Sequence, residues 1–308
     1  MKINKTIRLL AVVALSSTVV VGSSTAFAQE ARRITTEGDV TFTEGGSDGE
    51  GVVVIPPTEP EEPGIIIPPV DPDPGNPEIP NTGPLTIAYV PTINFGERAI
   101  SAQNQEYKAL ATEFDYYERD DEGNYLVDSE GNKIVADGKT PYVQFAQVQD
   151  TRGTNEGWHL TVSMTDFVTS ADTVNKTIDG AQINFKSGAL QNEGSAEHNA
   201  QIMEHLTLIP EQTATVMTAD AGTGAGVQSI FWGNIESLET TEIEKEVEVE
   251  VEDEEGNITT EIQHVTDILI ENPYVTLDVP GSSATDTTTY TTTLTWQLAA
   301  TPGILGVN

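Results

Sequence analysis

The four histidines come first in a search for chemistry, because histidine supplies both metal ligands and general bases. They are His159, His198, His205 and His264. None has the spacing of a His-Glu-x-x-His motif or of another common set of zinc ligands. His159 follows a tryptophan in a stretch with strand-like alternation, so its side chain points to the opposite side of the strand from that tryptophan. We therefore expect His159 to face solvent or to make hydrogen bonds.

Other catalytic motifs are also missing from the sequence. There is no Gly-x-Ser-x-Gly nucleophile elbow, and without cysteine the chain has neither a thiolate nucleophile nor metal thiolates. The glycine-rich residues 222–226 match neither Gly-x-Gly-x-x-Gly nor a P-loop, and no helical pattern follows them. We interpret this run as a β-turn. The oxygen-rich turns at 121–124 and 129–132 lack the order of an EF-hand. No metal or cofactor is expected.

Carboxylate pairs leave one enzymatic alternative open. Two of the 49 acidic residues could converge as a glycosidase pair. A glycosidase cleft usually presents several aromatic side chains to its sugar, however, and the whole chain has three tryptophans. We predict that the protein is not an enzyme, with glycoside hydrolysis as the least favoured alternative.

A column of glutamates is the strongest periodic signal. Between residues 242 and 252 every even position is glutamate, and the odd positions are apolar except for Lys245. This period predicts a strand with one apolar face and one face of carboxylates. After a turn at 253–257, residues 258–270 can return as its partner. We call the predicted acidic β-hairpin, residues 239–267, the acidic arm. Either its charge prevents edge-to-edge aggregation, or it binds a basic partner or a cation through Glu242, Glu244, Glu246, Glu248, Glu250 and Glu252.

Two Trp-x-Leu stretches lie in further strand-like runs. The first begins at Trp158 and the second at Trp296. Because alternate residues of a strand share a face, Trp158 lies in phase with Leu160, and Trp296 with Leu298. Chemistry alone favours core positions for both motifs.

The N-terminal residues predict export. Residues 1–28 combine a basic start at Lys2, Lys5 and Arg8 with a mostly apolar stretch and small residues at 26–28, which is typical of a secretory signal peptide. Cleavage after Ala28 would change the formal charge from −35 to about −38, because three positive charges and no acids are removed. Such a polyanion should repel nucleic acid and anionic lipid. No later stretch is apolar enough to span a bilayer.

The rest of the chain divides by composition. Residues 29–84 are acidic and rich in proline and glycine, which predicts a disordered spacer. From Leu85 onward, short β-branched and aromatic runs alternate with turn residues, which is typical of an all-β, sandwich-like domain. We predict strands at 85–90, 140–149, 158–167, 181–185, 201–209, 227–231, 275–279 and 290–298, and at most a short helix near 195–203.

Residues 85–308 resemble the WxL cell-surface domain of low-GC Gram-positive bacteria. The likeness is carried by Pro-Leu-Thr-Ile-Ala-Tyr-Val-Pro at 84–91, Gln-Asp-Thr-Arg-Gly at 149–153 and the two Trp-x-Leu motifs, with the glycine-rich run at 222–226 in a similar context. The acidic arm departs from the pattern and is interpreted as an insertion in a variable loop. The motif positions are Trp158, Leu160, Trp296 and Leu298, and the motif does not say whether they touch glycan or build the core.

The resemblance implies non-covalent attachment to the cell wall through peptidoglycan. It also implies a place in a surface or adhesion assembly with membrane-anchored and sortase-anchored proteins. One alternative is an adhesin whose main ligand is a protein, either of the host matrix or at the same surface. The least favoured alternative is an enzyme that hydrolyses wall glycan. In each case the protein is secreted and located at the cell wall.

Overall fold

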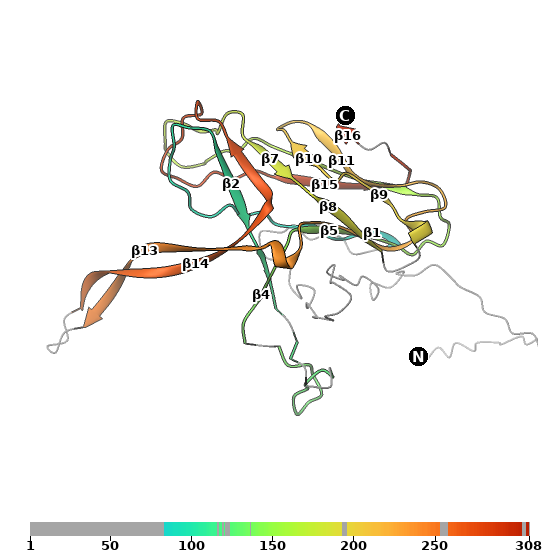
Figure 1. Cartoon of the computed structure of the whole chain (residues 1–308), viewed down its shortest axis with the longest axis horizontal. Coiled ribbons are helices and arrows are strands. Elements are labelled where there is room, and N and C mark those ends of the chain that lie inside the picture. Colours follow the sequence, from blue (N-terminus) through green and yellow to red (C-terminus); the bar gives the residue numbers. More distant parts are fainter. Residues whose placement is uncertain are drawn as a thin grey trace, which may run out of the picture. The chain divides into compact units, whose positions relative to one another are not determined.

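The computed structural model describes residues 83–308 except 116, 119, 121–123, 136, 193–195, 253–257, 304–305 and 308. The predicted signal peptide and nearly all of the predicted spacer lie outside the described residues. Regular structure in the described part is β-strand, apart from two single-turn 3-10 helices, η1 (Ala196–His198) and η2 (Ile235–Ser237). The prediction of an all-β domain is therefore confirmed (Figure 1).

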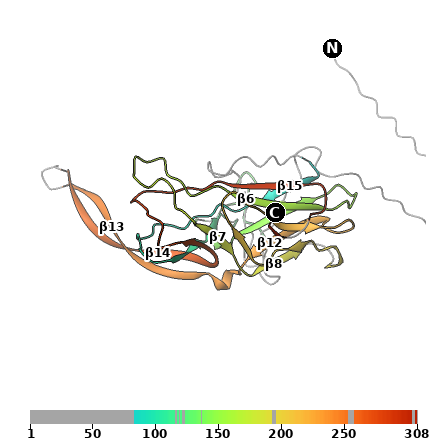
Figure 2. The ribbon, with the colours of Figure 1, turned by 90° about the horizontal axis from the view of Figure 1, so that it is seen from above.

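Two antiparallel sheets form the body of the domain. The first sheet has the strand order β1-β5-β12-β8, and its strands are β1 (Leu85–Tyr89), β5 (Phe145–Asp150), β12 (Gly226–Trp232) and β8 (Gly188–Asn192). The second has the order β15-β6-β11-β16, with β9 also paired to β11, and its strands are β15 (Leu294–Ala299), β6 (Trp158–Met164), β11 (Thr213–Ala219), β16 (Gly306–Val307) and β9 (Gln201–Ile202). Figure 2 shows β6 and β15 in one layer with β12 and β8 in the next.

A third sheet carries the acidic arm. Its order is β10-β7-β14-β13, with β2 also paired to β14, and its strands are β10 (Leu206–Leu208), β7 (Gln182–Phe185), β14 (Ile258–Val279), β13 (Glu239–Glu252) and β2 (Gln105–Leu110). A separate pair joins β3 (Thr112–Phe114) to β4 (Thr140–Tyr142). The end of β14 pairs with β2 and β7, whereas its earlier part pairs with β13 and extends away from the body (Figure 1).

One apolar cluster joins the three larger sheets. It includes Val148 on β5, Leu160 on β6 and Ile183 on β7, all 0% exposed. Burial of this kind stabilises a fold by about 25 cal/mol for each Å² of apolar surface removed from water. A second cluster surrounds Phe145, on which the ring of Tyr89 stacks at a centroid distance of 4.3 Å. These layers and their shared core are those of a sandwich-like domain.

Several predicted strand boundaries are wrong. The run 140–149 is divided between β4 and β5, and the run 201–209 between β9 and β10. The final strand begins at Leu294 and not at residue 290, because the threonine-rich residues before it form bends and a single bridge from Thr291 to Val168. The predicted short helix is limited to η1.

The acidic arm forms the predicted hairpin, with fourteen cross-strand pairs from Glu239↔Glu271 to Glu252↔Ile258. The pairing continues past residue 267, so the acidic arm comprises residues 239–271 in the structure. Its turn at 253–257 lies outside the described residues. The predicted apolar and carboxylate faces are those of β13, and its partner strand β14 does not repeat them. Glu242 lies opposite Ile268, and Ile243 lies opposite Asp267. Since residues directly opposite share a face, each face of the ribbon carries both acidic and apolar residues.

Candidate functional site

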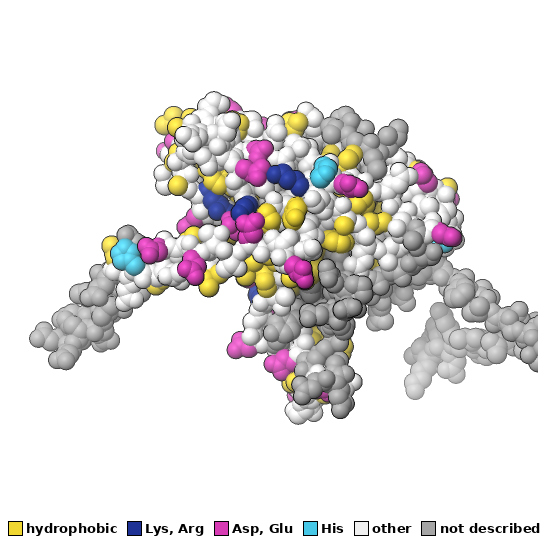
Figure 3. Space-filling view, in the orientation of Figure 1, with side chains coloured by type: hydrophobic (Ala, Val, Ile, Leu, Met, Phe, Trp, Pro, Cys, Tyr) yellow, Lys and Arg dark blue, Asp and Glu magenta, His cyan; other side chains and the backbone are white. Residues whose placement is uncertain are grey.

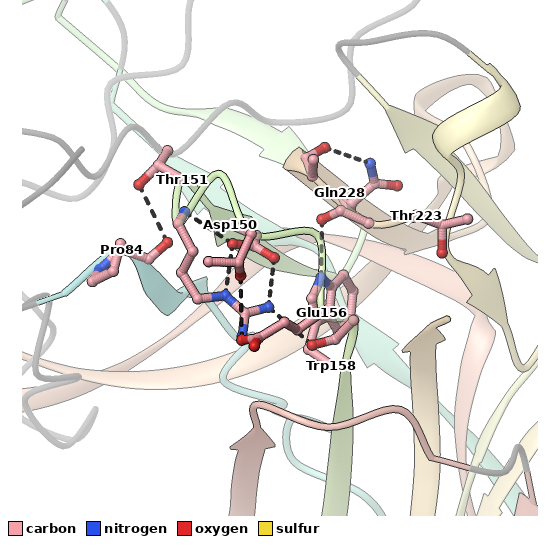
Figure 4. Close-up of polar contacts among 12 residues, drawn as sticks. Pro84, Asp150, Thr151, Glu156, Trp158, Thr223 and Gln228 are labelled. Atoms are coloured by element: carbon pink, nitrogen blue, oxygen red, sulfur yellow. Dashed lines mark hydrogen bonds and ion pairs between the residues drawn. The ribbon is translucent and has the colours of Figure 1, made fainter. Parts of the chain in front are cut away.

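The first Trp-x-Leu motif is sealed inside the domain. Trp158 and Leu160 are both 0% exposed. The indole Nε1–H of Trp158 donates a hydrogen bond to the carbonyl oxygen of Gly224, at 2.9 Å (Figure 4). A buried indole needs such a partner, because an unpaired N–H would lose its hydrogen bond to water. Trp158 therefore has no surface left for a ligand.

The glycine-rich run at 222–226 is shaped to fit this tryptophan. Gly224 has a φ of +77°, a backbone conformation that residues with a side chain rarely adopt. A Cβ at this position would lie 2.6 Å from Trp158 Nε1 and 2.3 Å from the Cβ of Ala219. The predicted turn is formed by residues 220–223, closed by a hydrogen bond from the Thr223 N–H to the Asp220 carbonyl oxygen, and Gly226 already begins β12. Gly224, between the two, allows the backbone to approach the indole closely.

An arginine clamp fixes the loop before Trp158. Arg152 donates from Nε to Asp150 Oδ1 at 2.9 Å and from Nη2 to Asp150 Oδ2 at 2.7 Å. Its Nη2 also donates to the carbonyl oxygen of Gly157, at 2.9 Å (Figure 4). The Arg152 and Asp150 side chains are only 9% and 2% exposed. The hydrogen bonds to Asp150 raise the pKa of Arg152, so the guanidinium keeps its charge.

Gly157 completes this arrangement directly before the motif. Its φ is +82°, and a Cβ there would lie 2.4 Å from the carbonyl oxygen of Ala219, the residue paired with Trp158 across β6 and β11. The two sequence groups therefore act together. Asp-Thr-Arg-Gly at 150–153 fixes the loop through the Arg152 hydrogen bonds, and this loop places Gly-Trp at 157–158. Their contacts position the tryptophan at the start of β6.

The second motif lies beside the first. Strands β15 and β6 are antiparallel, with Leu298 opposite Leu160 and Trp296 opposite Val162. All four residues belong to or pack against the main core cluster. The fold thus brings together two motifs that are 138 positions apart in the sequence (Trp158 to Trp296).

The two motifs differ in exposure. β15 is at the end of its sheet order, and Trp296 and Leu298 are half-buried, whereas their partners on β6 are fully buried. Thr295 and Gln297 alternate with them on the opposite face and are exposed. Of the three tryptophans in the chain, Trp158 and Trp232 are 0% exposed, and Trp296 is the one that is partly exposed.

Residues after β15 cross the outer face of the same sheet. The His159 Nδ1–H donates to the carbonyl oxygen of Thr301 at 2.5 Å, and the Gly303 N–H donates to Thr218 Oγ1 at 2.9 Å. The chain then pairs as β16 with β11. His159 therefore has the hydrogen-bonding role expected for it, on the face opposite Trp158.

The aspartates of the segment before β4 are used by their own turns. Asp120 Oδ1 accepts from the N–H of Asn124, and Asp128 Oδ1 accepts from the N–H of Asn132, at 2.8 and 2.9 Å. The hydrogen bonds from Asn132 lower the pKa of Asp128. Within the described ranges, no group of three or more acidic or histidine side chains is arranged to hold a metal ion.

The glutamates proposed for partner binding lie on β13. Glu242 and Glu244 are exposed, and their register partners are Ile268 and Thr266. Lys245 forms an ion pair with Asp267 at 2.8 Å, and this contact raises the pKa of Lys245 and lowers that of Asp267. β13 belongs to a different sheet from β6 and β15, which carry the Trp-x-Leu motifs.

Comparison with family models places the chain in a known domain family. The model for the WxL domain, described as surface cell wall-binding, matches residues 29–302. The chain belongs to the WxL domain family. Comparison with curated proteins and with solved structures found no match. The WxL match includes residues 29–84, so the predicted boundary between spacer and domain stays a prediction.

The WxL family is a cell-surface family that binds the cell wall and is not an enzyme family. None of the helices in the described part of the chain is long and apolar enough to cross a membrane. For the WxL domain in this chain, sequence reasoning found the motif residues but missed the roles of Arg152 and Gly224. The charged pair Asp-x-Arg close before Gly-Trp was the available signal for the first of these.

Proposed function

We propose that this WxL domain attaches the protein non-covalently to the bacterial cell wall by binding peptidoglycan, and that the Trp296 region of β15 makes the contact. The observation that carries the proposal is the match to a surface cell wall-binding family over residues 29–302. The exposure difference supports the choice of β15, because Trp158 is fully buried and Trp296 is half-buried on an edge strand.

The chemistry of Trp296 suits a glycan ligand. An indole presents a large apolar face that can stack on the apolar face of a sugar ring, as it stacks on other ring faces. The half-buried Leu294 and Leu298 lie on the same side of β15 as Trp296, and all three pack against the core, so the ligand would contact the part of Trp296 that stays exposed. The exposed edge of β15 offers backbone groups for hydrogen bonds to sugar hydroxyls or to the peptide stems.

A pulldown with purified peptidoglycan tests the proposal. The exported protein should be retained, and a Trp296→Ala variant should lose most of the retention while remaining folded. Thr295→Ala is the matched control, because Thr295 is the adjacent exposed residue on the opposite face. Absence of retention for the unaltered protein would refute wall binding through peptidoglycan. Equal retention of both variants would move the contact elsewhere on the domain.

A second candidate function is protein binding within a surface assembly. The acidic arm favours this function, because β13 is on a different sheet from the Trp-x-Leu motifs and places exposed glutamates outside the body. Partners anchored in the membrane or attached by sortase, or a host matrix protein, are the classes to test by crosslinking on intact cells. Glycan release during the peptidoglycan pulldown would instead revive the hydrolase alternative.

A further inference from the structure

The outer edge of β13 is unpaired in the described structure. β13 is the last strand in its sheet order and pairs with β14 alone. Every second N–H and C=O group along such an edge points away from the sheet and can pair with another strand. Most proteins shorten, cover or twist an edge of this length, which here runs for 14 residues.

The base of the acidic arm is held firmly to the body. Glu271 is buried and accepts from Arg98 Nη2 at 2.5 Å and from Thr241 Oγ1 at 2.9 Å. Next to it, the fully buried Asn272 donates from Nδ2 to Gln144 Oε1 and to the carbonyl oxygen of Trp232, at 2.7 and 2.9 Å. The register shift between Asn272 and Thr276 marks the position where β14 leaves the body. The edge is thus presented in a fixed direction.

The arm also exposes apolar side chains beside its acidic ones. Ile262 and Ile268 are 61% and 58% exposed, and Val247 is 38% exposed. Figure 3 shows acidic and hydrophobic side chains next to one another on the described part of the arm. A segment whose only task was to keep the protein soluble would have no need of these apolar residues. The combination fits a partner that supplies both positive charge and apolar surface.

A second copy of the chain does not fit this edge. β13 contains seven glutamates and one lysine. Strands in a sheet are about 4.8 Å apart, so pairing two copies of β13 would bring fourteen carboxylates together. Like charges on neighbouring strands are destabilising, and a formal charge of −35 on each chain adds to the repulsion.

We propose that the outer edge of β13 binds an extended segment of another surface protein by strand addition, and that this segment alternates lysine or arginine with apolar residues. In the added strand, residues opposite the glutamate positions share their face. Basic side chains would therefore lie beside Glu242 and Glu244, and apolar ones beside Ile243 and Val247. Backbone hydrogen bonds would supply affinity and the alternation would supply specificity. This role rests on the second candidate function, protein binding by the acidic arm, and does not depend on wall binding.

Synthetic peptides test the proposal on the exported full-length protein. The probe alternates lysine and valine over the length of residues 242–252, and its binding is followed by fluorescence anisotropy at physiological salt. One matched peptide has the same composition with the lysines and valines in separate blocks. Another keeps the alternation but is N-methylated on both strand edges, which blocks backbone pairing. The alternating peptide should bind at least about tenfold more tightly than either control, equivalent to about 1.4 kcal/mol.

Protein variants complete the test. E242Q/E244Q/E246Q should weaken binding about tenfold, whereas E130Q/E204Q/E211Q removes the same number of charges at sites outside the arm and should leave binding unchanged. Equal binding of all three peptides would overturn the proposal, because it would show attraction by net charge alone. No binding of the alternating peptide would also overturn it. Dimers in sedimentation that dissociate when β13 is altered would assign the edge to a second copy instead.

Discussion

The two Trp-x-Leu motifs share their residue types and lie on neighbouring strands, but their surroundings differ. Trp158 is on β6, between β15 and β11, with its indole fully buried and its Nε1–H bonded to Gly224. Trp296 is on β15, at the end of the sheet, and is half-buried. A central strand is covered on both edges, whereas an edge strand leaves side chains partly accessible.

Because of this difference, we assign the two motifs different roles under the proposed function. The first motif, together with Arg152 and the glycines that surround it, is a folding element. The second shares the core through Leu298 and Leu160 but keeps part of its indole at the surface. Wall binding and stability are therefore expected to separate when each motif is altered alone.

The largest contrast is expected from alanine at each tryptophan. Trp158→Ala removes a fully buried indole and its hydrogen bond, so it should lower the free energy of unfolding by about 3–5 kcal/mol. Trp296→Ala loses only part of that burial and should cost about 1–2 kcal/mol. Urea denaturation followed by circular dichroism measures both values. Equal losses would show that the two motifs are equivalent parts of the core.

The arginine clamp should account for much of the first motif's stability. Arg152→Gln leaves the buried Asp150 carboxylate without its charged partner, and breaking such a pair costs about 3 kcal/mol or more. Glu156→Gln is the control. Glu156 lies 3.8 Å from Arg152 and is largely exposed, so its loss should change stability by less than about 1 kcal/mol. A clamp that contributes nothing would give the same unfolding midpoint for both variants.

The glycine turn around Trp158 offers a finer comparison. Gly224→Ala combines a positive φ with a clash against the indole and should cost about 2–3 kcal/mol. Gly222→Ala has a φ of +93° but no atom within 4 Å of the added Cβ, so only backbone strain of about 1 kcal/mol applies. Comparing the melting temperatures of the two variants separates the cost of backbone strain from the cost of the clash with the indole. If both melt alike, the close approach to Trp158 is unimportant.

Fluorescence gives the smallest but most direct signal. Of the three tryptophans, only Trp296 has an accessible indole, so acrylamide should quench a single fraction of the emission. Trp296→Phe should abolish that fraction, and peptidoglycan fragments should protect it in the unaltered protein. Quenching that persists in Trp296→Phe would mean that Trp158 or Trp232 becomes exposed in solution.

Many of the strands could be predicted because apolar and polar residues alternate along them. The strands β1, β6, β7 and β12 and the acidic arm show period-two or compact β-branched runs, which local sequence records directly. β11 was not predicted. Its sequence, Thr-Ala-Thr-Val-Met-Thr-Ala, is buried at almost every position because β11 is a central strand, so no exposed face produces an alternating signal.

By itself, the sequence determined the all-β class, the position of the acidic arm, and the shared face of Trp158 and Leu160, because strand periodicity is a local property of the chain. Only the tertiary structure decided that Leu160 lies opposite Leu298, that the glutamates of β13 share a face with the isoleucines of β14, and that one tryptophan is sealed while the other is accessible. Register, strand order and edge position depend on residues far apart in the sequence, and no local pattern records them.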